Sequence, residues 1–365
     1  MPVSRLLTEG LAEQVAAAYA DAEVRLLRLV AERLQAGAES PRWAEDKLAE
    51  LQMLRGRASR IMAGATAQAL DALMVALRRA YLRGTAAGQG DADALGVDFT
   101  GPSEQAERQV AALYASMREQ WQGMELQVVR ATVDAYRDAV VRASAGTLTG
   151  AATRLQDAQV ALDDLARRGV TGFTDTAGRR WGLQSYVEMA TRTTTTQAAV
   201  SGHLDRLEQA GINLFLVSNS SRECELCAPW EGKVLSRGPV AAITRNVRTG
   251  ERMRVDVDGT VQEATSAGLF HPNCTHNLSG YIPGATRRGD ADSNPKGYAE
   301  RQEQRRIERK AREWDRRAAA AMTPEAKRLA EVKRREWRDR ARDHAKATGL
   351  NRKTNRETAN PTVAR

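Results

Sequence analysis

The sequence predicts an α+β protein that is predominantly helical, with long N-terminal helices, a small central α+β domain and basic C-terminal helices. The first half is rich in alanine and has no proline between Pro41 and Pro102. Because an interior proline costs a helix about 3 kcal/mol, long helices can run in such gaps. Turn signals and β-branched residues begin at Gly169, and charges of both signs at helical i,i+4 spacing fill the last quarter.

The segment 1–168 is expected to form a helical arm or bundle. Ser40 is a candidate N-cap with Pro41 at the first helical position, which predicts a helix that continues to about Arg83. The glycine-rich stretch 84–103 is then predicted to be a loop.

Ser103 is expected to begin a second long helix in this segment. Apolar side chains recur along it with alternating spacings of four and three residues: Val110, Tyr114, Met117, Trp121, Met124, Val128, Ala131 and Ala135. Such a seven-residue repeat places them on one face of a helix. The stripe therefore predicts a core or subunit contact, and a further helix fits the stretch 151–169.

The segment 169–285 is predicted to be the small α+β domain. A helix closed by Gly211 is followed by "INLFLV", which has the pattern of a buried strand. "EGKVLS" could pair with that strand. "RTGE" and "VDGT" are turn signals between alternating residues, so the stretch 245–264 predicts a hairpin.

The C-terminal part holds all the excess positive charge of the chain, whose formal net charge is +9. From Thr286 to Arg365, 24 Lys and Arg residues face 13 Asp and Glu residues, whereas the rest of the chain is slightly acidic. Segment 286–348 is predicted to form basic helices, with Thr323 as an N-cap, and segment 349–365 to be disordered. This asymmetry predicts an anionic partner, most plausibly nucleic acid.

Several protein classes are disfavoured by the sequence. The N-terminus mixes charged with apolar residues, unlike a secretory signal. We find no run of about 18 uninterrupted apolar residues, so no membrane partner is expected. Three cysteines do not build an extracellular disulfide framework, and synthesis in a reducing cytosol is expected.

The cysteines and two of the four histidines have the spacing of a metal site. Cys224 and Cys227 form a C-x-x-C pair, and Cys274 lies in "HPNCTH" between His271 and His276. Zinc takes four ligands in a tetrahedron, and thiolates with imidazole are its usual donors. The pattern predicts a structural Cys3His zinc site, in which the sequence does not select between the two histidines.

Other interpretations of these residues remain open. Without metal, buried thiols and imidazoles could orient loops by hydrogen bonds. A thioredoxin-like motif lacks its βαβ context, and a zinc deaminase would need H-x-E upstream of C-x-x-C. In the main enzymatic alternative, an HNH-like nuclease, His271, Asn273 and His276 would hold a catalytic metal. That site needs a further general-base histidine, but His203 and His344 lie in predicted helices.

Three stretches together resemble the phage minor capsid (minor head) proteins, a family related to the Mu F-like head-morphogenesis proteins. They are "GVTGFTDTAGRRWGLQSYVEMATRT", "GINLFLVSNSSRECELCAPWEGKV" and "GLFHPNCTHNLSGYIPG", within residues 169–285. The residues that carry the likeness outside the Cys/His positions are Asp175, Gly178, Arg179, Trp181, Tyr186, Arg192 and Thr193.

The resemblance implies a structural virion component and no enzyme. Such a protein would act in head assembly near the portal vertex, with the portal or major capsid protein as partner, and could leave with the DNA. The basic tail would then contact packaged double-stranded DNA through its phosphates. Some related proteins carry a C-terminal toxin domain, but here a basic helical tail takes that place. A nucleic-acid-binding protein outside the virion is a third alternative.

The motif residues are expected to maintain the fold. Asp175 and Arg179 could pair across a tight turn at Gly178, although an exposed pair contributes only about 0–1 kcal/mol. Trp181 and Tyr186 are expected to pack a helix onto the sheet. A further expectation is that Arg192 and Thr193 hydrogen-bond the loops that carry the cysteines.

Overall fold

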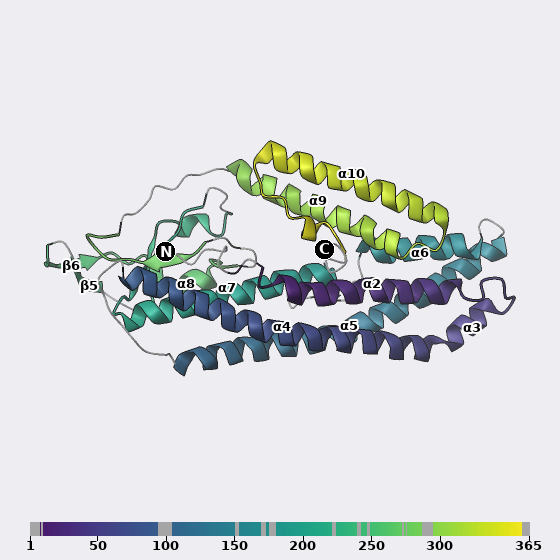
Figure 1. Ribbon diagram of the computed structural model, residues 1–365, viewed down its shortest axis with the longest axis horizontal. Coiled ribbons are helices and arrows are strands. Elements are labelled where there is room, and N and C mark those ends of the chain that lie inside the picture. Colours follow the sequence, from purple (N-terminus) through teal and green to yellow (C-terminus); the bar gives the residue numbers. More distant parts are fainter. Residues whose placement is uncertain are drawn as a thin grey trace. The chain divides into compact units, whose positions relative to one another are not determined.

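The computed structural model confirms the predicted fold class: the chain is predominantly helical, with a small mixed sheet (Figure 1). Extended helices form where alanine and leucine recur without proline, as in the first half of the chain. The structure describes residues 8, 10–93, 104–149, 153–168, 173–174, 180–220, 224–238, 242–246, 249–271, 274, 276–286 and 295–359.

The helices precede and follow the short strands. The helices are α2 (Glu13–Gln35), α3 (Trp43–Ala49), α4 (Leu51–Asp93), α5 (Glu104–Thr149), α6 (Arg154–Arg168), α7 (Leu183–Gln209), α8 (Val261–Ser266), α9 (Pro295–Ala319) and α10 (Pro324–Thr348), with 3-10 turns η1 (Ala228–Trp230) and η2 (Thr354–Arg356). The strands are β1 (Phe173–Thr174), β2 (Arg180–Trp181), β3 (Leu214–Val217), β4 (Val234–Ser236), β5 (Ala242–Arg245), β6 (Arg252–Val255), β7 (Gly259–Thr260) and β8 (Leu278–Gly280).

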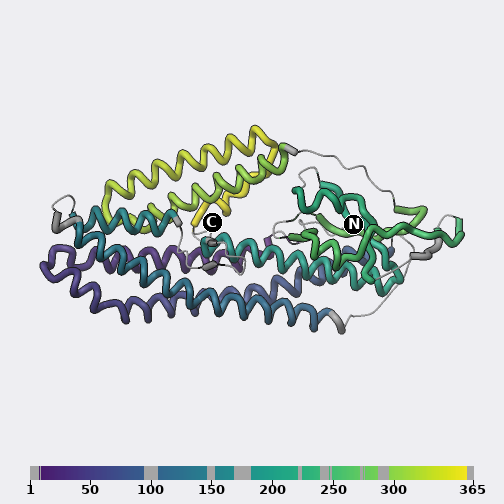
Figure 2. The backbone as a smooth tube through the Cα atoms, turned by 180° about the vertical axis from the view of Figure 1, so that it is seen from behind, coloured from purple at the N-terminus to yellow at the C-terminus, as the bar shows by residue number. Residues whose placement is uncertain are grey.

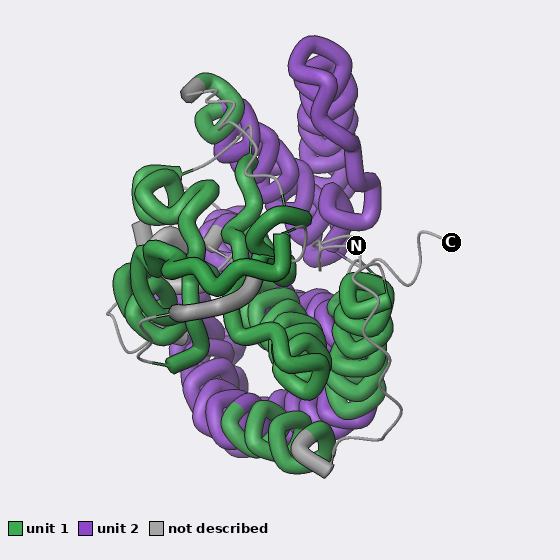
Figure 3. Tube along the Cα trace, turned by 90° about the vertical axis from the view of Figure 1, so that its left-hand side faces the viewer, with its two compact units in different colours: residues 1–13, 72–116, 189–299 green, residues 14–71, 117–188, 300–365 purple. Residues whose placement is uncertain are grey.

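By packing, the chain divides into two compact units (Figure 3). Unit 1 consists of residues 1–13, 72–116 and 189–299, and unit 2 of residues 14–71, 117–188 and 300–365. Each unit is made of three segments that are distant in sequence, and the segments of the two units alternate along the chain. This division therefore does not follow the boundaries at 168, 285 and 348, which remain predictions about the sequence.

The predicted glycine-rich loop at 84–103 is wrong for its first ten residues, because helix α4 continues to Asp93. The remaining ten lie outside the described residues. Gly84 lies against α7, where an added Cβ would fall 1.9 Å from the carbonyl oxygen of Ala199. Across the same interface, a Cβ on Gly202 would fall 2.3 Å from the carbonyl oxygen of Tyr81. These glycines therefore permit close approach of two helices rather than a turn.

The start predicted at Ser40 is displaced by a few residues. The Ser40 hydroxyl accepts a hydrogen bond from the Arg42 backbone N–H at 3.3 Å, and α3 begins at Trp43. A separate helix, α4, then follows α3. The indole N–H of Trp43 donates to the Leu34 carbonyl oxygen at 3.1 Å and fixes this corner of unit 2.

Helix α5 confirms the predicted apolar stripe. Val110, Met117, Trp121, Met124 and Val128 are buried, and Tyr114, Ala131 and Ala135 are half-buried. Further along, the buried positions move to Thr132, Tyr136 and Ala139. A straight helix of 3.6 residues per turn drifts about 20° per heptad against a seven-residue repeat, which accounts for the move.

Helix α4 is long and apolar enough to cross a membrane by length and composition alone, with a window mean hydropathy of 1.2. A mostly buried core helix meets the same criterion, and 39% of the apolar window of α4 is buried. Its buried residues recur every three or four positions: Leu54, Ala58, Met62, Ala65, Ala69, Leu73 and Leu77. We attribute its apolar character to this packing face.

The sheet of unit 1 has the order β7-β4-β3-β8. The predicted strand is β3, and it pairs antiparallel with β4 through Phe215 and Leu235, which confirms the pairing expected for "EGKVLS". Strand β8 pairs antiparallel on the other side of β3, and β7 pairs parallel with β4. Strands β5 and β6 form an antiparallel hairpin that confirms the first part of the predicted stretch 245–264. The second part is different, because β7 pairs with β4 and is followed by α8. Gly211 ends the preceding helix with a φ of 76°.

Both faces of β3 are covered, although its strand neighbours, β4 and β8, have only three residues each. Phe215 and Val217 join a core that includes Leu207 of α7, Leu235, and Cys227. The opposite face contributes Leu214 and Leu216 to a smaller cluster. Because alternate residues of a strand lie on opposite faces, one face of β3 packs in the core that contains Cys227, and Cys224 and Cys274 are partly buried against that core.

Helices α9 and α10 lie side by side and antiparallel (Figures 1 and 2). Arg334 pairs with Asp315 at 2.8 Å, and His344 Nε2 lies 2.9 Å from the Glu300 carbonyl oxygen. Thr323 caps α10 as predicted, since its hydroxyl accepts the Ala326 N–H.

The segment after α10 has defined contacts as far as residue 359, in place of the disorder expected from the sequence. The carboxylate of Asp315 accepts hydrogen bonds from the Thr358 hydroxyl and the Ala359 backbone N–H, both at 2.9 Å. Arg352 pairs with the buried Glu357 at 2.6 Å. Residues 360–365 lie outside the described residues.

Candidate metal centre and basic surfaces

Two turns present the cysteines and one histidine in equivalent ways. The backbone N–H of Cys227 donates to the carbonyl oxygen of Cys224 at 3.0 Å, which closes the turn before η1. In the second turn, the N–H of Cys274 donates to the carbonyl oxygen of His271 at 2.8 Å. Each turn therefore carries potential ligands at its first and fourth positions.

Tertiary folding brings the two turns together. The Sγ of Cys224 lies 2.9 Å from His271 Nε2, and the Sγ of Cys227 lies 3.5 Å from that of Cys274. His276 is adjacent, because its Nδ1 lies 3.5 Å from the Sγ of Cys274. The five residues predicted as candidate ligands are thus assembled in one place, as two overlapping groups of three that share Cys227.

The protein electrostatics favour one thiolate in the cluster. A hydrogen bond from Cys227 lowers the pKa of Cys274 to about 4, with a further contribution from His276. The same hydrogen bond, together with burial, raises the pKa of Cys227. Burial lowers the pKa of His276, but hydrogen bonds to Cys274 and Glu231 outweigh it, so the net pKa is raised.

Glu231 is a member of this site that the sequence prediction missed. Its Oε1 lies 2.5 Å from His276 Nε2, and both side chains are almost fully buried. The same oxygen accepts the backbone N–H of Ser220 at 2.9 Å. The "WEGK" sequence gives no local signal for this role, because the partner histidine lies 45 residues away.

The other motif residues have separate positions. Asp175, Gly178 and Arg179 lie outside the described residues, and for Trp181 the structure defines the strand but not the side chain. The Tyr186 hydroxyl donates to Gln120 of α5 at 3.3 Å, so this residue contacts a helix. The Thr193 hydroxyl donates to the Met189 carbonyl oxygen in its own helix at 2.9 Å, and Arg192 is half-buried in the same helix.

The histidines outside the cluster belong to helix contacts. His203 of α7 is fully buried and lies 3.5 Å from Asp91 of α4. Burial lowers the pKa of His203 to about 4. His344 is half-buried in α10. Among the described residues, His271 and His276 are the histidines that belong to a group that could hold a metal, together with the cysteines. Asn273, which the nuclease alternative requires, lies outside the described residues.

Helix α10 presents a row of cations. Within the described part of the chain, Lys327, Arg335, Arg338 and Lys346 form no ion pair. At 3.6 residues per turn, the four fall within an arc of about 100° and span about 29 Å along the helix axis. Lys327, Arg335 and Lys346 are exposed, and Arg338 is half-buried. We call these four residues the α10 stripe.

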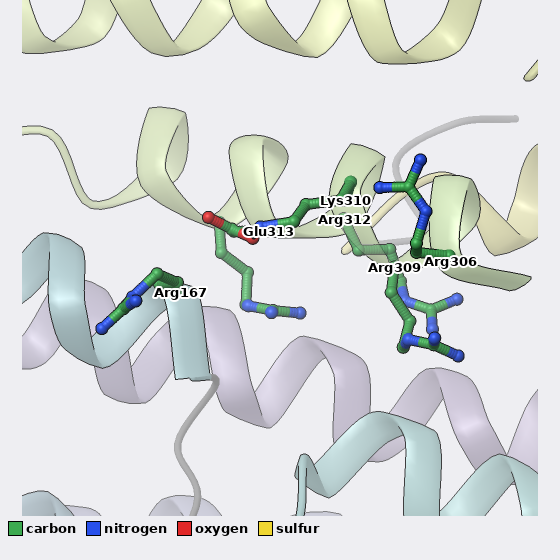
Figure 4. A pocket seen from close by; sticks show the side chains of 7 residues that line it. Arg167, Arg306, Arg309, Lys310, Arg312 and Glu313 are labelled. Atoms are coloured by element: carbon green, nitrogen blue, oxygen red, sulfur yellow. Dashed lines mark hydrogen bonds and ion pairs between the residues drawn. The ribbon is translucent and has the colours of Figure 1, made fainter. Parts of the chain in front are cut away.

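A basic pocket of 410 Å³ lies along α9 (Figure 4). Its lining consists of Arg167, Arg306, Arg309, Lys310, Arg312, Glu313 and Arg316, and Arg167 comes from α6 while the others come from α9. Several of these cations are engaged within unit 2. Arg316 donates to the Ala166 carbonyl oxygen at 3.0 Å, and its guanidinium lies 3.7 Å from Glu23.

The positive charge of the C-terminal part has two roles. Buried cations hold α9 in place through hydrogen bonds and ion pairs, and exposed cations form a basic surface. Arg312 donates to the carbonyl oxygen of Arg356 at 2.6 Å and is buried. Arg309 and three cations of the α10 stripe, Lys327, Arg335 and Lys346, are exposed at the surface. The predicted tail is therefore both a structural part of unit 2 and a basic surface.

The fold and the cluster define a predominantly helical protein with a small sheet domain that carries a Cys/His site. A comparison with known families matches residues 6–346 to the family described as phage minor capsid protein 2. Comparisons with curated proteins and with solved structures found no significant match.

The match covers nearly the whole chain, so this chain belongs to the phage minor capsid protein 2 family. It is accordingly a structural protein of the bacteriophage head, located in the virion. The resemblance based on residues 169–285 is confirmed and extends to both the N-terminal helices and α10.

Proposed function

We propose that this capsid protein acts at the portal vertex without enzymatic activity and contacts packaged double-stranded DNA through the α10 stripe. The location follows from the resemblance of residues 169–285 to minor head proteins. The DNA contact rests on one observation, a row of four cations, three of them exposed, on a single face of α10.

The geometry of the stripe suits a phosphate backbone. Phosphates of one DNA strand recur about every 3.4 Å along the duplex axis, so a row of about 29 Å faces several of them. The stripe contains only one acidic residue within its arc, the half-buried Glu331. Lysine and arginine contacts of this kind neutralise charge without reading base sequence.

The neighbouring acids explain why other cations of α10 are unsuited to this role. Arg328 pairs with Glu325 at 2.8 Å, and Arg342 pairs with Asp339 at 2.9 Å. Those ion pairs lower the positive potential around Arg328 and Arg342, whereas the stripe residues have no ion pair among the described residues and their positive potential is not reduced in this way. A negatively charged ligand is therefore expected to approach the stripe first.

The test is the salt dependence of binding of the full-length protein to a duplex of arbitrary sequence. Each phosphate contact contributes about −0.9 to the slope of log K against log salt concentration. A variant with Lys327→Gln, Arg335→Gln, Arg338→Gln and Lys346→Gln is expected to reduce the magnitude of this slope by about 3.6.

A charge-matched control separates a specific surface from net charge. Four arginines of α5, Arg108, Arg118, Arg130 and Arg142, are exposed and have no ion pair among the described residues. Changing all four to Gln removes the same charge and is expected to leave the slope unchanged. An equal decrease in both variants, or in neither, would refute DNA contact through α10 and leave family membership intact.

A further inference from the structure

We propose that Cys224, Cys227, His271 and Cys274 bind one zinc ion, and that His276 and Glu231 hold the Cys274 thiolate from outside the coordination sphere. This inference concerns unit 1 and does not depend on the proposed DNA contact. It selects one of the two histidines that the sequence left equivalent.

The first argument is the spacing within each turn. Structural zinc sites take ligand pairs separated by two to four residues. Cys224 with Cys227 and His271 with Cys274 both have two intervening residues, and both turns are closed by a backbone hydrogen bond between the paired positions. His276 is separated from Cys274 by one residue, which is shorter than this spacing.

The second argument is how the two turns face each other. The residues at the first position of each turn face each other, with 2.9 Å between Cys224 Sγ and His271 Nε2. The residues at the fourth position also face each other, with 3.5 Å between the sulfur atoms of Cys227 and Cys274. A tetrahedron with zinc–sulfur bonds of about 2.3 Å has ligand–ligand edges of about 3.5–3.8 Å. The Cys227–Cys274 distance has this length, and the Cys224–His271 distance reaches it with a shift of about 0.6 Å. The ligand atoms of Cys224, Cys227 and His271 lie within 4.8 Å of one another, whereas Cys274 forms such a group with Cys227 and His276, so zinc binding must draw Cys274 toward Cys224 and His271.

The third argument is that His276 is already engaged through both ring nitrogens. Its Nε2 donates to Glu231 at 2.5 Å, while its Nδ1 lies 3.5 Å from the Sγ of Cys274. Its backbone N–H also donates to that sulfur, at 3.4 Å. A carboxylate on the far ring nitrogen also accompanies histidines that bind a metal directly, so it is the one-residue spacing from Cys274 that assigns His276 to the outer position. Glu231 is itself fixed by the Ser220 N–H.

A metal here would fasten two loops separated by 47 residues. The sheet between them has strands of two to four residues, and Cys227 belongs to its core while Cys274 packs against that core. Because the ligands are brought together only in the folded chain, zinc binding contributes directly to folding stability. The donor set, thiolates with imidazole, is the one zinc prefers.

The test is the zinc content of the full-length protein, purified under reducing conditions, by plasma mass spectrometry. One zinc per chain is expected. His271→Ala is expected to lose the metal, while His276→Gln keeps it with an affinity weaker by about 10–100-fold, the usual effect of removing an outer partner. His344→Ala, in α10, is the matched histidine control and is expected to bind zinc normally.

A second measurement uses the unaltered chain, in case a variant does not fold. Removal of zinc by a chelator is expected to speed hydrogen exchange in residues 214–280 and to leave α10 unchanged. Cobalt substitution should give the strong sulfur-to-cobalt absorption of three thiolates. The assignment is overturned by absence of zinc, by zinc lost in His276→Gln and kept in His271→Ala, or by a Cys227–Cys274 disulfide in the protein as purified.

Discussion

Replacement of Gly84 by alanine tests the close contact of helices α4 and α7. The added Cβ would lie 1.9 Å from the Ala199 carbonyl oxygen and 2.7 Å from its carbonyl carbon, whereas real Cβ contacts stay beyond 3.0 Å. The obstacle is backbone, so the helices must separate by about 1 Å in a densely packed interface. Overpacking of this kind typically costs 1–3 kcal/mol.

Gly90→Ala in the same helix is the control, because nothing lies within 4 Å of its added Cβ. Alanine is favoured over glycine in a helix by up to about 1 kcal/mol. The 1.9 Å contact with backbone places the overpacking cost at Gly84 near the upper end, about 3 kcal/mol, and the helix gain of about 1 kcal/mol opposes it. Gly84→Ala is therefore expected to destabilise unit 1 by about 2 kcal/mol, while Gly90→Ala is neutral or stabilising.

Hydrogen exchange of the amides of residues 72–93 and 189–209 measures the opening of this interface locally. A loss of 2 kcal/mol corresponds to exchange roughly 30-fold faster in both stretches. The reasoning is refuted if Gly84→Ala exchanges as slowly as Gly90→Ala, since α4 and α7 would then not be in backbone contact.

Further predictions concern buried polar groups. Because burial lowers the pKa of His203 to about 4 from an unfolded value near 6.5, its contribution is complete above pH 6.5 and is lost as the pH falls toward 4. Thermal melts over this range should show up to about 3 kcal/mol less acid sensitivity in His203→Gln; an unchanged pH profile would contradict this. Asp315→Ala removes the acceptor of two hydrogen bonds from residues 358 and 359. It should make the segment after α10 sensitive to limited proteolysis, and continued protection would show that other contacts hold it. Thr260→Ala removes the capping box of α8 with Glu263 and should cost about 1 kcal/mol in urea unfolding; an unchanged urea midpoint would contradict this.

The sequence predicted those elements that depend on residues close together in the chain. Strand β3, the hairpin of β5 and β6, and the apolar stripe of α5 follow from residue alternation and helical period. The Thr323 cap and Gly211 terminus likewise depend on side chains and dihedral angles within a few residues.

Features that depend on distant residues were not predictable. A glycine that permits close helix contact looks the same in sequence as one that forms a turn, so Gly84 was assigned to a loop. The partner of Arg316 is Glu23, which no local pattern links to α9. Glu231 acquires its role only when folding places it beside His276.

The candidate metal site was predictable as a set of residues but not as an arrangement. Cysteine and histidine spacing identified all five potential ligands, and the structure brings them together. The choice between His271 and His276 required the geometry of the two turns.

The most direct test of the central claim, a head protein whose α10 stripe touches packaged DNA, is ultraviolet crosslinking of intact DNA-filled heads followed by peptide mass spectrometry. The account predicts that the chain is present in the particles and that nucleotide adducts map to residues 324–348, with none in DNA-free heads. Filled heads that contain the chain with adducts elsewhere or nowhere would contradict the proposed DNA contact, and heads that lack the chain would contradict its place in the virion.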